Sequence, residues 1–207
     1  SKYEDGNKFN IGRLNKTSTQ LGLLADIATN LQVALSNRSN PGVTPQGLAA
    51  TAQGMLDFIQ NILNSKFGNE FLFSGDTTMV PTVDSIDNPA AIRGGTPTKD
   101  YYLGNYNTIS FPADQFTQID IGANAGSDGI AALIYALNVV KYNATDSEAL
   151  NYANDMSVNA ATDIFTDRAL LNTQFKKLED AQERLITQKE SVEAVIKEVG
   201  FKTPTQA

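Results

Sequence analysis

The chain has 207 residues, of which 41% are hydrophobic, so it carries enough apolar side chains to bury a core. Its formal net charge is -7 and its 16 lysines and arginines are spread out, which argues against the concentrated basic face of a nucleic-acid site. Cysteine and histidine are absent, which excludes thiol nucleophiles, thiolate or imidazole metal sites and histidine acid–base catalysis. We therefore expect a protein with no catalytic activity, no cofactor and no metal.

The sequence predicts no membrane insertion. No run approaches the roughly 18 apolar residues of a membrane span. Residues 1–15 also lack the apolar region of a signal peptide.

Residues 14–38 predict the first helix. Apolar or small side chains recur there at alternating spacings of three and four, which places them on one face as in a coiled-coil seam. Asn40, Pro41 and Gly42 then break the helix. The seam positions that we expect to carry folding include Leu21, Leu24 and Leu31.

A second amphipathic helix is predicted over residues 44–66. Thr44 supplies a side-chain N-cap and Pro45 suits the first helical position, where its missing N–H costs nothing. The same three and four spacing continues along this segment. Its predicted seam residues include Met55, Ile59 and Ile62.

Residues 69–125 predict a small β-rich insertion between helices. The run 70–75 is short, aromatic and bounded by glycine, and residues 108–111 and 116–121 alternate as strands do. Many Pro, Thr, Asp and Gly residues separate these runs, which indicates long turns. Because helical spacing resumes directly afterwards, we expect two discontinuous parts, 1–68 and 126–207, to form one helical rod domain.

Two helices are predicted after the insertion, over residues 128–142 and 147–198. Thr145 and Glu148 match a capping box at the start of the second. A helix of about 50 residues spans roughly 75 Å, too long for a compact domain, so we expect an elongated antiparallel rod that is mainly α with a β-rich insertion. The predicted seam of the long helix includes Leu171, Phe175, Leu178 and Leu185.

Other chemistry in the insertion has simpler explanations. Asp76, Asp84 and Asp87 lie in turn-rich sequence, where aspartate routinely forms local turns. Tyr101, Tyr102 and Tyr106 are candidates for stacking on sugars, and a carbohydrate-binding role stays open on that basis.

One motif closes the second helix and opens the insertion, and its residues are Asn64, Phe67, Gly68, Phe71, Leu72, Phe73, Ser74 and Gly75. This motif resembles the signature of the flagellin superfamily, especially its hook-associated junction branch. The step at residues 102–105, the segment 126–140 and the segment 166–185 are also similar to that family, in the same order. We expect Phe71, Phe73 and Gly75 to fix the joint between rod and insertion.

The resemblance implies a secreted structural subunit of the bacterial flagellum that joins hook to filament by packing and self-association. The implied partners are hook-associated proteins, flagellin, further copies in a ring and an export chaperone. The resemblance also implies that the family's terminal polymerisation helices have no counterpart before Lys2 or after Gly200. Filament flagellin, a coiled-coil secretion-system protein and a carbohydrate-binding surface protein remain as alternatives.

Overall fold

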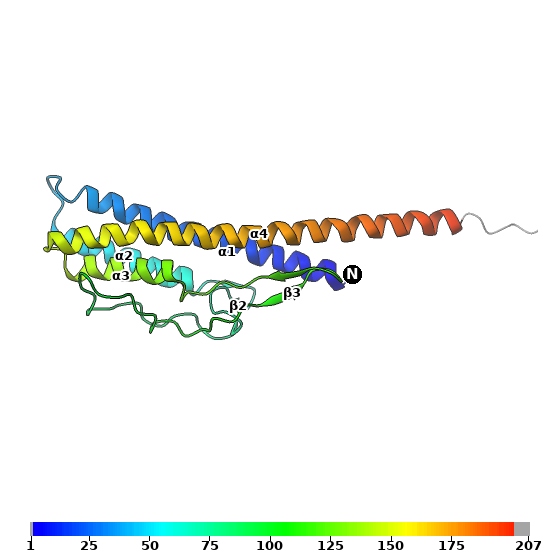
Figure 1. Ribbon diagram of the computed structural model, residues 1–207, viewed down its shortest axis with the longest axis horizontal. Coiled ribbons are helices and arrows are strands. Elements are labelled where there is room, and N and C mark those ends of the chain that lie inside the picture. The colour runs from blue at the N-terminus through cyan, green and yellow to red at the C-terminus, as the bar shows by residue number, and fades with distance from the viewer. Residues whose placement is uncertain (1, 201–207) are drawn as a thin grey trace, which may run out of the picture.

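The computed structural model describes residues 2–200 as a rod of four helices with a long inserted segment (Figure 1). Helix α1 spans Lys2–Ser36, α2 spans Pro45–Leu63, α3 spans Asp128–Tyr142 and α4 spans Ser147–Gly200. The 54 residues of α4 correspond to about 81 Å at 1.5 Å per residue. The expected elongated, mainly helical architecture is confirmed.

Helices α1 and α4 form the body of the rod and run antiparallel, with α4 continuing well beyond the amino end of α1 (Figure 1). Their shared face is apolar, with Leu24, Ala28 and Ile164 fully buried. Helices α2 and α3 pack on each other and α3 packs on α4. This arrangement buries one continuous core that reaches Ala181 of α4, and the carboxyl end of α4 extends beyond the other helices (Figure 1).

Helix α1 begins at Lys2, twelve residues before the predicted start. The prediction followed apolar residues, whereas the buried face of the first three turns is polar: Glu4, Asn7, Asn10 and Arg13 are all at most 8% exposed. These positions are three residues apart, and the helical spacing continues from Arg13 through Thr17 to Leu21. A search for apolar periodicity therefore missed this part of the helix.

The helix starts follow local capping. The Thr44 hydroxyl accepts from the Gly47 amide at 3.0 Å, as predicted for α2. The capping box predicted at Thr145 and Glu148 is wrong, because Asp146 caps α4 instead. Its Oδ1 accepts from the Glu148 amide at 2.9 Å and from the Ala149 amide at 3.2 Å. A carboxylate is the better partner there, since it also faces the positive end of the helix dipole.

Two small antiparallel sheets accompany the helices. Strand β1 (Lys66–Phe67) pairs with β2 (Glu70–Phe71), and β3 (Ser110–Pro112) pairs with β4 (Gln118–Asp120) with Phe111 opposite Ile119. The strands are shorter than their sequence runs, and turns connect them. The inserted segment lies along one side of the rod (Figure 1).

Side-chain amides fix the path of the insertion against α3. Asn138 is fully buried in α3, and its Nδ2 donates to the Ile86 carbonyl at 2.9 Å while its Oδ1 accepts from the Asn88 amide at 2.9 Å. Val83, Ile86 and Tyr101 join the same apolar core as the helices. The insertion therefore depends on the rod for much of its burial.

Candidate functional site

The family motif lies where α2 ends and the insertion begins. Asn64 is the C-cap of α2, and its Oδ1 accepts from the amides of Thr82 and Val83 at 3.0 and 3.1 Å. Its Nδ2 donates to the Val83 carbonyl at 3.0 Å. One side chain thus connects the end of the helix to a loop almost twenty residues further on.

The three aromatic residues of the motif lie in three different environments. Phe67 in β1 makes an edge contact with Phe9 of α1, with ring centroids 5.1 Å apart. The Phe71 ring lies 4.2 Å below the Lys66 ammonium group, and Phe73 is completely buried. The motif therefore contacts α1, its own hairpin and the core in turn.

Glycine and small residues allow the chain to turn closely at this joint. Gly68 lies between β1 and β2 with φ of 58°. Gly75 has φ of 67°, and a Cβ there would lie 2.2 Å from the Asn105 carbonyl oxygen. Leu72 and Ser74 are buried, and the Ser74 carbonyl accepts from the Asn105 amide at 3.2 Å. A larger residue at position 75 would push apart two segments of the insertion.

A buried ion pair, which sequence analysis missed, connects α1 to the joint. The Arg13 side chain is 1% exposed and pairs with Glu70, whose side chain is 36% exposed, and its Nη2 donates to the Phe71 carbonyl at 3.2 Å. Burial lowers the pKa of Arg13, and the Glu70 carboxylate opposes this shift. Arg13 lies four residues before the buried Thr17, on the same face of α1. This helical spacing was the signal in the sequence, but a search for apolar residues alone does not detect it.

The tyrosines considered for sugar stacking make contacts within the insertion. The Tyr101 hydroxyl donates to the Ala125 carbonyl at 2.8 Å, and the Tyr102 hydroxyl donates to the Asn105 carbonyl. Tyr102 and Tyr106 make an edge contact with centroids 5.3 Å apart. Burial raises the pKa of Tyr102. Asp76 pairs with Asn105 in the same cluster.

The predicted seam residues lie at different depths. Those of α1 and α2 are at most 3% exposed except Met55, which is half-buried. In α4, Leu171 and Leu178 are buried, whereas Phe175 and Leu185 are half-buried. Beyond them the apolar spacing continues into solvent: Val192, Val195, Ile196 and Val199 are 57–64% exposed.

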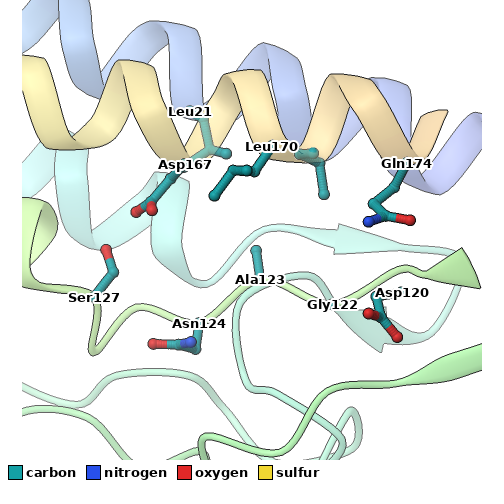
Figure 2. A pocket seen from close by; sticks show the side chains of 10 residues that line it. Leu21, Asp120, Gly122, Ala123, Asn124, Ser127, Asp167, Leu170 and Gln174 are labelled. Atoms are coloured by element: carbon teal, nitrogen blue, oxygen red, sulfur yellow. The ribbon is translucent and has the colours of Figure 1, made fainter. Parts of the chain in front are cut away.

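A pocket of about 230 Å³ lies between α1, α4 and the extended chain that joins β4 to α3; we name it the α4 pocket (Figure 2). Leu21, Ala123, Leu170 and Leu171 form its apolar wall. Figure 2 shows Asp167, Leu170 and Gln174 projecting from α4 toward the extended chain. Burial raises the pKa of Asp167, and the carboxylates of Asp163 and Asp128 raise it further.

The described residues form neither a metal-binding cluster nor a membrane-spanning helix. Within residues 2–200, no group of three acidic side chains is placed to hold a metal ion. No helix in the described part of the chain is long and apolar enough to cross a membrane.

Comparison with known proteins gives matches in structure alone. No family model matches the chain, and no curated protein matches its sequence. The crystal structure of Bacillus cereus FlgL superposes with a TM-score of 0.71 at 12% identity, covering 90% of this chain and 96% of that one. Flagellar hook-associated protein-3 from Legionella pneumophila superposes with a TM-score of 0.72 at 11% identity, covering 95% of this chain and 94% of that one. Xanthomonas campestris FlgL superposes with a TM-score of 0.67 at 10% identity, covering 95% of this chain and 96% of that one.

This chain has the fold of flagellar hook-associated proteins. The resemblance read from its motif is confirmed at the level of the fold. The matches span nearly the whole chain and the inserted segment with it, so the helices and the insertion are both part of the shared architecture.

Proposed function

We propose that the chain is a structural subunit of the bacterial flagellum that joins hook to filament by packing against neighbouring subunits. It is exported, is found outside the cell and catalyses no reaction. Its neighbours are hook-associated proteins, flagellin and further copies of itself in a ring, and an export chaperone accompanies it. The shared fold supports this role.

The observation that carries the proposal is the exposed apolar seam near the carboxyl end of α4, from Val192 to Val199. Val192, Ile196 and Val199 follow the same three and four spacing as the buried Leu178, yet they are more than half exposed. At about 25 cal/mol per Å² of apolar surface removed from water, covering this stripe favours association with another helix. The seam is therefore the surface that we assign to neighbouring subunits.

The residues of the joint and the division of the chain follow from this role. We assign residues 1–68 and 126–207 to the packing rod and residues 69–125 to an insertion on its outer side. The joint motif from Asn64 to Gly75 then holds the insertion at a fixed angle to the rod. The seam residues of α1, α2 and proximal α4 stabilise the rod itself.

Electron microscopy of cells that lack the protein tests the role directly. We expect hooks without attached filaments, and normal filaments would contradict the proposal. Complementation with Val192→Asp/Ile196→Asp should fail to restore filaments. Ala194→Asp places a carboxylate on the opposite face of the same helix turns and should restore them. Counting subunits per filament distinguishes a junction protein from flagellin.

A further inference from the structure

Phe116 is held in solvent at the tip of the β3–β4 hairpin. It is 87% exposed, the highest value for a large apolar side chain among the described residues. The tip is nevertheless well connected: the Ala113 amide donates to the Thr117 carbonyl at 2.9 Å, and the Phe116 amide donates to Asp114 Oδ1 at 2.8 Å. Arg184 of α4 donates to Asp114 at 2.7 Å and to Thr117 at 3.1 Å.

An exposed aromatic ring on a hydrogen-bonded backbone has the properties of an interface anchor. Large aromatic side chains supply much of the binding energy in protein interfaces, and a backbone that is already ordered loses little entropy on binding. The Asp114 carboxylate shows how firmly the tip is held. Burial alone would raise its pKa, but hydrogen bonds from Arg184 and from the Phe116 amide lower the pKa to about 2.

The α4 pocket on the same molecule has the size and lining to receive such a ring. Its volume is about 230 Å³, below the roughly 300–1,000 Å³ of small-molecule sites, so it suits a single large side chain. Leu21, Ala123, Leu170 and Leu171 form its apolar wall, and Leu170 is 64% exposed. The rest of the lining is mainly polar and consists of Asp120, Gly122, Asn124, Ser127, Asp167 and Gln174. Insertion of a ring would cover Leu170.

The charges around the ring and the pocket are complementary. Arg184 lies beside the hairpin tip with its side chain 52% exposed. Asp120 and Asp167 line the α4 pocket, and among residues 2–200 no lysine or arginine does so. Arg184 is paired with Asp114, whose side chain is only 10% exposed, so the guanidinium is the exposed end of that pair. A copy that inserts Phe116 thus brings the exposed end of a guanidinium toward two carboxylates, which favours the correct orientation on encounter.

We propose that Phe116 of one copy of this chain inserts into the α4 pocket of a second copy. The donor and acceptor surfaces are different parts of the molecule. When the same two copies do not exchange the contact reciprocally, it is heterologous and its repetition generates a ring or a helical array. This inference rests on the proposed function, because it names one contact through which the copies associate. It is separate from the distal α4 seam, which lies elsewhere on the rod.

Disulfide cross-linking tests the contact, because the native sequence contains no cysteine. Phe116→Cys and Leu170→Cys are made as separate variants, mixed in equal amounts and oxidised gently. We expect the mixed heterodimer to form faster than either homodimer. Ile92→Cys, at a residue that is 58% exposed elsewhere on the insertion, is the matched control for Phe116→Cys. Equal cross-linking of the Phe116→Cys and Ile92→Cys variants to Leu170→Cys overturns the inference.

Sedimentation of the full chain separates this inference from the proposed function. Phe116→Ser should weaken self-association by about tenfold or more, whereas Ile92→Ser should leave it unchanged. If the native chain self-associates and the Phe116→Ser variant self-associates equally strongly, the Phe116 contact is refuted. Self-association itself, and with it the proposed function, is then unaffected. If the native chain does not self-associate and the cysteine variants do not cross-link, both the contact and self-association fail. Loss of association with Ser at position 116, together with the specific cross-link, supports the contact against another occupant of the pocket.

Discussion

The Arg13–Glu70 ion pair should show an unequal response to loss of its two partners. Glu70→Gln removes the charge that compensates a guanidinium with a 1% exposed side chain, whereas Arg13→Met leaves a carboxylate that is 36% exposed and reaches water. Breaking a buried pair from one side costs about 3–5 kcal/mol when the remaining charge stays buried. The Gln side chain still accepts a hydrogen bond, so we expect Glu70→Gln to lower the free energy of unfolding by about 2–3 kcal/mol.

Arg13→Met should cost less, about 1–2 kcal/mol, because methionine fills the site and Glu70 becomes hydrated. The double variant should have nearly the same free energy of unfolding as Arg13→Met alone, since the Glu70→Gln side chain then faces no buried cation. Urea unfolding followed by circular dichroism measures all three. Arg93→Met, in an ion pair with Glu148 whose side chains are 54% and 69% exposed, is the control and should change stability by under about 1 kcal/mol. The reasoning is refuted if Glu70→Gln costs no more than this control.

Three further predictions concern the joint, the hairpin and the pocket. Gly75→Ala should destabilise the chain by at least about 2 kcal/mol in urea unfolding, because φ is 67° and the new Cβ meets Asn105. The hydrogen bonds around Asp114 lower its pKa to about 2, so they stabilise the hairpin above about pH 4 and are lost as pH falls through 2, which NMR of the Phe116 amide reports. The pKa of Asp167 is raised, so Asp167→Asn should raise the thermal midpoint at pH 7, and this gain should vanish by pH 3.

Each of these has a matched control. Gly54→Ala lies in α2 with open space around its Cα and should stabilise the chain slightly; a similar change for both glycines would contradict the first prediction. For the hairpin, Arg184→Met should move the acid transition of the Phe116 amide to higher pH, and no movement would contradict the pKa argument. For the pocket, a gain from Asp167→Asn that persists at pH 3 would mean that charge is not its cause.

The sequence allowed prediction of elements whose signal is local. Helices α2, α3 and α4 begin and end close to the predicted positions, because apolar spacing, Thr44 as a cap and the absence of Gly and Pro between Gly129 and Gly200 all agree. The joint motif begins at Asn64, which is the residue that caps the end of α2. The first twelve residues of α1 were missed because their buried face is polar.

Features that depend on distant contacts could not be predicted. Asn64, Asn105 and Asn138 fix the insertion through bonds to backbone groups far along the chain, and nothing near an asparagine in sequence distinguishes this use from an ordinary turn. The α4 pocket likewise exists only because Leu21, Ala123 and Leu170 meet in the folded chain. The sequence also contains no sign that Phe116 is exposed, because the pattern of residues 116–121 predicts a half-buried strand.

The polar buried face at the start of α1 also determines how the rod responds to force. A purely apolar seam can slip by one helical turn, about 5.4 Å, and find an almost equivalent packing. Asn7 donates to the Ala113 carbonyl at 3.0 Å and Arg13 pairs with Glu70, and these bonds form in only one alignment of α1 with its neighbours. A slip would leave buried amide and guanidinium groups without partners. Under an axial load, α1 should therefore hold its register until it detaches, so that the rod fails abruptly and does not creep.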